Sequence, residues 1–165
     1  ERRYRRQQTA PCGAVRRRAC EALMVTENRL ETLRMIVGSH PILAGDSRTG
    51  DIVQELKSVI GTNRIAGSDR WLLQVLHTTR ALDTCLSRVV AQRGWTVATP
   101  SLGAYLVKLR AEGIIVEHQR NHWQTKLVQP RNTYMHSANK MPTQQQSKNL
   151  LSEMDACMSI VLARV

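Results

Sequence analysis

The sequence predicts an all-α bundle of about five to seven antiparallel helices. Apolar residues recur at the three- and four-residue spacing of one helix face over several long segments. No useful length of chain alternates apolar and polar residues as a half-buried strand does. Capping residues and glycines stand at the ends of the periodic segments. The 165 residues include no Phe, so we expect a core of aliphatic side chains.

Three helices are expected in the first half of the chain, at 17–37, 51–60 and 68–93. Gly38 suits the left-handed position that ends the first helix, and Asp51 can cap the start of the second. The third helix has the clearest apolar stripe, which consists of Leu72, Val75, Leu76, Leu82, Leu86, Val89 and Val90.

The second half predicts four further helical segments. One begins with Thr99 as cap and proline next, and another covers most of 114–129, although its first residues could form a strand. Pro130 is expected to interrupt that segment and to open a short helix over 131–138. The last helix begins after Thr143, with a glutamine three residues on as in a capping box. Its expected apolar face is Leu151, Met154, Met158, Val161 and Val165.

Positive charge is concentrated at the start of the chain. The formal net charge is +11, and residues 1–18, with seven Arg and one Glu, carry +6 of it. Arg16, Arg17 and Arg18 belong to this arm, which is either a solvated, disordered tail or a contact for nucleic acid. We expect one helical domain over 19–165 after the arm, because this length suits a single domain.

Composition excludes several classes of protein. No run of about 18 apolar residues is present, so we expect no membrane-spanning helix. The four cysteines (Cys12, Cys20, Cys85 and Cys157) form no CxxC pair, which favours free thiols in a cytoplasmic protein over a disulfide framework or a zinc site. We expect no cofactor, since glycine-rich phosphate loops and nucleophile elbows are absent as well.

His118 and His122 stand four residues apart, which would place both imidazoles on one helix face. This spacing suits a metal pair, but no third ligand is evident, and Arg120 and Lys126 bring positive charge nearby. A solvated polar face is therefore the preferred interpretation, and no metal site is predicted.

The segment RNTYMH, residues 131–136, combines groups that can act on a phosphodiester. Arg131 can bind phosphate oxygens with two donors, and His136 can move a proton near neutral pH. Asn132 can donate to phosphate, and the preceding proline would place both residues in a first helical turn that favours anions. RNA is the natural substrate, because its 2′-hydroxyl supplies a nucleophile. The alternative is a helix cap with an Arg and a His on the surface. Five residues advance a helix by about 500°, so the two side chains do not lie on one face.

At this motif the sequence resembles the HEPN superfamily (higher eukaryotes and prokaryotes nucleotide-binding). That family is marked by an Arg, usually followed by Asn or another polar residue, and a His four to six residues on. The segment HSANKMP after the motif and the helix LLSEMDACMSIVL are similar to the family's turn and last helix. The helices WLLQVLHTTRALDTCLSRVV and SLGAYLVKL resemble its central pair, so the resemblance covers 68–165.

The resemblance implies a metal-independent endoribonuclease of the toxin or phage-defence type. It further implies a helical homodimer in which two motifs share a cleft, with a cognate antitoxin or a larger defence complex as possible partner. By position, Arg131 would bind phosphate, His136 would transfer a proton and Asn132 would orient them. Tyr134 and Arg120, together with the N-terminal arm, are expected to contact RNA. The alternatives are a non-catalytic HEPN module that binds RNA or nucleotide, a dimerising scaffold, and an unrelated helical interaction protein.

Overall fold

The computed structural model describes residues 27–137 and 139–165. Within these ranges every regular element is helical and no strand occurs, which confirms the predicted all-α class. In chain order the elements are a helical segment over 27–39, α2 (Thr49–Gly61), a short 3-10 helix (Thr62–Arg64), α3 (Asp69–Gln92), α4 (Leu102–Ala111), α5 (Glu117–Trp123), a π-helical turn (Gln124–Val128), α6 (Gln129–His136) and α7 (Gln144–Leu162).

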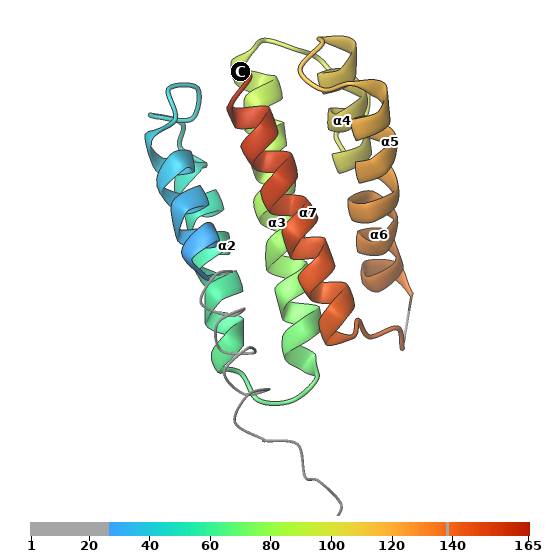
Figure 1. The fold of residues 1–165 in the computed structure, drawn as a ribbon. Coiled ribbons are helices and arrows are strands. Elements are labelled where there is room, and N and C mark those ends of the chain that lie inside the picture. Colours follow the sequence, from blue (N-terminus) through green and yellow to red (C-terminus); the bar gives the residue numbers. More distant parts are fainter. Residues whose placement is uncertain (1–26, 138) are drawn as a thin grey trace, which may run out of the picture.

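Helix α3 lies at the centre of the bundle (Figure 1). It contacts α2 and α7, and it also contacts α4 and α6. Figure 1 shows the segment 27–39 and α2 on one side of α3 and α7, and α4, α5 and α6 on the other. Helix α3 has 24 residues and extends over about 36 Å. It contacts helices of both groups.

The core is mostly aliphatic, as the absence of Phe predicts, but Tyr105 and Trp123 are also buried in it. The buried side chains of α3 include five of the seven residues of the predicted stripe: Val75, Leu82, Leu86, Val89 and Val90. Buried polar side chains add a specific contact between α3 and α7. The hydroxyl of Ser147 donates to Oε1 of Gln74 at 2.5 Å and lies 3.3 Å from the carbonyl oxygen of Trp71. Because both partners are buried, this hydrogen bond fixes how the two helices align.

The loop between the helical segment 27–39 and α2 is fastened to the bundle at both ends. Nε2 of His40 lies 2.8 Å from the carbonyl oxygen of Leu162, at the end of α7. Asp46 accepts hydrogen bonds from Arg88 at 2.7 Å and Gln92 at 2.8 Å, both on α3. The loop therefore closes one end of the bundle without regular structure of its own.

Several predicted helix ends are correct and three are not. Thr143 caps α7 with Gln146 in the expected capping box, and Gly94, at φ +68°, follows α3 in the left-handed region. Gly38 lies inside the helical segment 27–39 and does not have a positive φ, so it is not the left-handed end of that helix. Asp51 is not the cap of α2, because that helix begins two residues earlier, after Arg48. The cap of α4 is Ser101 rather than Thr99.

The largest departure concerns Pro130. The short helix α6 has Pro130 in its first turn, as predicted, but it covers Gln129–His136 rather than 131–138. Helical backbone continues from α5 through the π-helical turn into α6, so the expected interruption at the proline is wrong. A proline inside a helix lacks its N–H and crowds the carbonyl four residues before it. Here the preceding turn is widened, and the N–H of Gln129 donates to the carbonyl of Gln124, five residues back. The wider turn is how the chain admits proline without ending the helix.

Candidate functional site

Helix α6 carries the predicted motif and lies between two pockets. Arg131 and Met135, one turn apart, line a pocket on the side of α3. Pro130 and Tyr134, also one turn apart, line a second pocket on the side of α7. None of the side chains of α6 is fully buried. The helix therefore presents different residues of one short motif to different surroundings.

We call the first pocket the polar pocket. It lies between α2, α3 and α6 and has a volume of about 430 Å³. Its lining consists of Arg48, Asp51, Gln54, Glu55, Leu76, Thr79, Arg80, Asp83, Thr84, Arg131 and Met135. Three guanidinium groups thus meet three carboxylates, so the pocket has no large excess of either charge.

Most charged groups at the polar pocket have a partner. Arg48 Nε lies 2.9 Å from Oδ2 of Asp51. Glu55 is bound twice, since Arg80 Nε lies 3.0 Å from its Oε1 and His77 Nδ1 lies 2.6 Å from its Oε2. Glu55 thus connects α2 to two residues of α3, whereas the pair of Arg48 and Asp51 is exposed.

Arg131 and Asp83 interact across the polar pocket. The Asp83 side chain is half-buried, and this burial raises the pKa of its carboxyl group, while the positive charge of Arg131 acts in the opposite direction. Arg131 also donates from Nη1 to Oδ1 of Asn132 at 3.0 Å. The Arg131 guanidinium therefore lines the pocket and is also hydrogen-bonded to the next residue of the motif.

Asn132 and His136 lie on the outer face of α6. Both are exposed, and their four-residue spacing places them one turn apart. His136 lines neither of the two pockets. Within one chain the structure therefore brings Arg131 and Asn132 together, but it leaves His136 on a different side of the helix from the Arg131 pocket.

The expected anion site at a helix N-terminus is wrong. Arg131 and Asn132 stand inside a continuous helical stretch rather than in the first turn of an open helix. Gln129, which would lie at such an end, already donates its N–H within the π-helical turn. Any phosphate at this site must therefore be bound by side chains, above all by Arg131, and not by free backbone N–H groups.

Tyr134 lies in the second pocket, which has a volume of about 390 Å³. This pocket is formed by the π-helical turn, α6 and α7, and its polar lining includes Lys126, Gln146 and Asn149. Partial burial raises the pKa of the Tyr134 phenol. The residue expected to contact RNA is thus separated from Arg131 by the width of α6.

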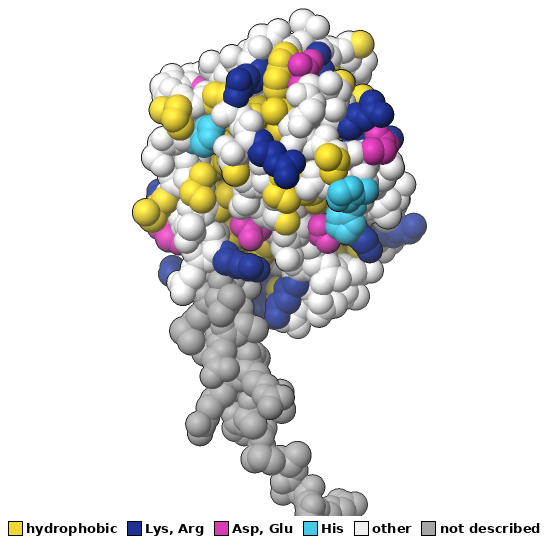
Figure 2. All heavy atoms as spheres, turned by 45° about the horizontal axis from the view of Figure 1, so that its top comes forward, with side chains coloured by type: hydrophobic (Ala, Val, Ile, Leu, Met, Phe, Trp, Pro, Cys, Tyr) yellow, Lys and Arg dark blue, Asp and Glu magenta, His cyan; other side chains and the backbone are white. Residues whose placement is uncertain are grey.

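Of the remaining predicted RNA contacts, the structure describes only Arg120, which does not line the polar pocket. Arg120 lies on α5 and donates to Oε1 of Glu117 at 2.6 Å, and Arg110 also pairs with this carboxylate. Arg16, Arg17 and Arg18 lie outside the described residues. Figure 2 shows one face of the molecule, where basic side chains are interspersed with acidic and apolar ones and do not form one continuous patch.

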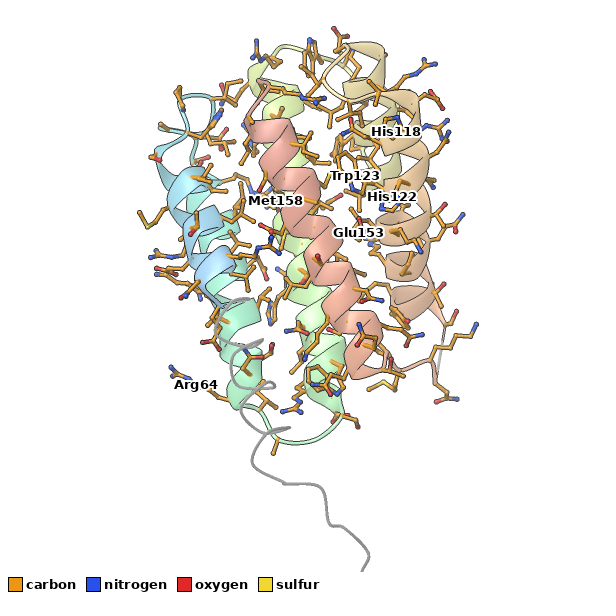
Figure 3. All side chains as sticks on the ribbon, viewed as in Figure 1. Arg64, His118, His122, Trp123, Glu153 and Met158 are labelled. Atoms are coloured by element: carbon orange, nitrogen blue, oxygen red, sulfur yellow. The ribbon has the colours of Figure 1, made fainter. Side chains whose placement is uncertain are left out.

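One of the two histidines of α5, His122, contacts α7. His122 Nε2 lies 2.8 Å from Oε2 of Glu153, and both face the gap between the two helices in Figure 3. His118 stands one turn away on α5. In the part of the chain that the structure describes, no three His, Cys, Asp or Glu side chains come together as a metal ion would need.

Asp83, Glu55 and Arg80 are pocket residues that the sequence analysis did not single out. They stand on two helices and are far from the RNTYMH segment in the sequence, so no local motif joins them. One signal was present: Thr79, Asp83 and Thr84 are polar residues within the most regular apolar segment of the chain.

The chain matches no protein-family model, no curated protein and no solved structure. None of the helices in the described ranges combines the length and the apolar character that a membrane span requires. The class established here is accordingly an all-α bundle with a polar pocket at α6.

Proposed function

We propose that the chain is a metal-independent endoribonuclease of the HEPN type. The observation that carries the proposal is the placement of the motif on α6. Arg131 lines a pocket large enough for part of a nucleotide, and it is hydrogen-bonded to Asn132, which shares the exposed face with His136. The HEPN resemblance supplies the reaction class, and these residues supply suitable chemistry.

In this proposal each residue of the motif has one task. Arg131 binds the scissile phosphate and stabilises the charge that grows on its oxygens. His136 transfers a proton during cleavage, and Asn132 holds the guanidinium of Arg131 in position through the 3.0 Å hydrogen bond. The 2′-hydroxyl of the RNA is the nucleophile, so the protein needs none of its own.

A second copy of the chain completes the proposed site. His136 is exposed and lies outside the polar pocket, so a single chain offers Arg131 and His136 on different sides of α6. A homodimer that joins the outer faces of two α6 helices would bring both motifs into one cleft. The toxin or phage-defence role, a cognate antitoxin and a cytoplasmic location belong to the same proposal.

Incubation of the purified chain with RNA in the presence of EDTA tests the function. We expect cleavage by the wild type and a loss of about 100-fold or more in rate for Arg131→Ala and for His136→Ala. His118→Ala and Arg64→Ala are matched controls, because both residues are exposed and lie outside the site (Figure 3), and they should cleave normally.

Two results would contradict the proposal: no cleavage by the wild type, or equal cleavage by His136→Ala. Tight binding of RNA without products would instead favour a non-catalytic module. Sedimentation of the wild type reports the dimer, and a monomer that cleaves at full rate would exclude the shared cleft.

A further inference from the structure

Asp83 is placed to act on the same substrate as Arg131. It stands on α3 and lines the polar pocket, into which Arg131 also faces from α6. The charged groups that line the pocket with it are Arg48, Asp51 and Glu55 from α2 and its cap, Arg80 from α3 and Arg131 from α6. A ligand in the pocket would therefore meet a carboxylate and a guanidinium from two different helices.

The hydrogen-bonding state of Asp83 differs from that of the other acids in the pocket. Asp51 is paired with Arg48, and Glu55 is paired with both Arg80 and His77. Asp83 forms no hydrogen bond and no ion pair within residues 27–137 and 139–165, although its side chain is half-buried. The oxygens of Asp83 are therefore available to accept a hydrogen bond from a ligand hydroxyl in the pocket.

Ribose is a suitable ligand at this position. Carboxylates of Asp and Glu commonly accept the ribose 2′-hydroxyl in nucleotide sites. The pocket volume of about 430 Å³ falls within the range of about 300–1,000 Å³ for small-molecule sites. A sugar bound in the pocket with its 3′-phosphate on Arg131 would place its 2′-hydroxyl on the side of Asp83.

We propose that Asp83 is the general base of the cleavage reaction and accepts the proton of the ribose 2′-hydroxyl while Arg131 binds the adjacent phosphate. This inference rests on the proposed ribonuclease function and deepens it, because it assigns the opposite role, that of general acid, to His136. Burial raises the pKa of the Asp83 carboxyl group. This favours a role as general base, since a base works best when its pKa approaches the pH at which the enzyme acts.

The proposed step balances without any further reactant. The 2′-oxygen transfers its proton to Asp83 and forms a bond to phosphorus. The bond between phosphorus and the 5′-oxygen of the next nucleotide breaks, and that oxygen takes a proton from the imidazolium of His136, which the second copy of the chain supplies in the proposed dimer. The products are a 2′,3′-cyclic phosphate end and a 5′-hydroxyl end, and the two side chains then exchange protons with water.

The test compares Asp83→Asn with a matched control. Asp155 on α7 is also half-buried, its pKa is also raised by burial, and a nearby arginine also opposes the shift. It lines a different groove, beside the helical segment 27–39. We expect Asp83→Asn to lower kcat/KM for RNA by about 100-fold or more, and Asp155→Asn to cleave as the wild type does.

A pH profile separates catalysis from positioning. In the wild type, kcat/KM should fall at low pH as a carboxylate becomes protonated, and Asp83→Asn should lose this limb. RNA with a 2′-deoxy sugar at the cleavage site should bind Asp83→Asn as it binds the wild type, but it should bind Arg131→Ala more weakly. If activity falls while the low-pH limb remains, Asp83 merely positions Arg131 and the general-base role is wrong.

The two proposals fail in different ways. Absence of cleavage by the wild type overturns both. Cleavage that is abolished in His136→Ala but normal in Asp83→Asn overturns only the role of Asp83. Thermal unfolding of each variant reports whether it is folded, and we expect Asp83→Asn to be at least as stable as the wild type because it removes a half-buried charge without a donor.

Discussion

Among single residues, Asp46 shows how a carboxylate can remain ionised although it is buried, because hydrogen-bond donors surround it. Only 1% of its side chain is exposed, and it accepts hydrogen bonds from the backbone of Arg48 and from the side chains of Arg88 and Gln92. These donors favour the ionised form and lower the pKa of Asp46 to about 2. The loop before α2 is thus anchored to α3 by a charge-dependent contact.

Because the pKa of Asp46 is lower in the folded state than in the unfolded state, its contribution is present above pH of about 4 and is lost as the pH falls towards 2. Asp46→Asn should lower the free energy of unfolding by about 1–3 kcal/mol at pH 7 and make it less dependent on pH in that window. Urea unfolding at pH 7, 4 and 2.5 measures both effects.

Asp51→Asn is the control for Asp46→Asn, since Asp51 forms only an exposed ion pair with Arg48. Its loss should cost less than about 1 kcal/mol at pH 7. Equal pH dependence in Asp46→Asn and the wild type would show that the Asp46 contacts do not contribute to stability.

Among the helices, the start of α4 shows how a cap is selected. The sequence offers two candidates, Thr99 followed by proline and Ser101 two residues later. In the structure Ser101 has extended backbone, and its hydroxyl accepts the N–H of Ala104 at 3.2 Å. Both residue types are good caps, so local preference alone did not decide between them. Packing of Leu102 into the core fixes where the helix begins.

Substitution at the two candidate caps should therefore give unequal results. Ser101→Ala should lower the free energy of unfolding by about 1 kcal/mol because the N–H of Ala104 loses its acceptor. Thr99→Ala should change it by less than about 0.5 kcal/mol, as expected for an exposed residue outside any helix. Denaturation in urea measures both. A larger effect at Thr99 would mean that α4 begins there in solution.

At the scale of the whole molecule, the core encloses two thiols. Cys85 on α3 and Cys157 on α7 are both free and buried. Burial raises the pKa of Cys85 to about 12, and it also raises that of Cys157. Because the thiolate is the reactive form, these side chains should react with thiol reagents only when the bundle opens. They report the stability of the bundle as a whole.

Core substitution should accelerate this reaction. Leu82→Ala removes a fully buried side chain and should cost about 2–5 kcal/mol, so labelling of Cys85 and Cys157 should become at least about 30-fold faster. Val107→Ala is the control, because Val107 is 54% exposed on α4 and should leave the rate unchanged. Mass spectrometry of labelled peptides follows each thiol separately. Fast labelling of both cysteines in the native wild type would contradict the buried arrangement.

Helical periodicity was sufficient to predict the class of the fold and most of its core. The long stripes of α3 and α7 identify their buried faces because each depends only on spacing within one helix. The path of the chain at Pro130 could not be predicted in the same way. A proline normally ends or kinks a helix, and only a widened turn before it reverses that expectation.

The candidate site was predictable only in part. Arg131, Asn132 and His136 could be proposed from the sequence because they form one short segment. The pocket that receives Arg131 depends on Glu55 and Asp83, which reach it only when α2, α3 and α6 pack together. No residue spacing in the sequence predicts that these side chains come together. The sequence also predicted an open helix end that could bind phosphate, whereas the structure has continuous helical backbone there.

The helix that bears the motif has no fully buried side chain, while both of its flanks face pockets. Its exposed residues Asn132 and His136 therefore contribute little to the stability of the bundle, and substitutions there should be tolerated by the fold, whereas Tyr134 and Met135 pack against the core. The motif can thus vary with few constraints from the core. A lineage could alter, weaken or abandon the chemistry of α6 and still keep the same stable bundle.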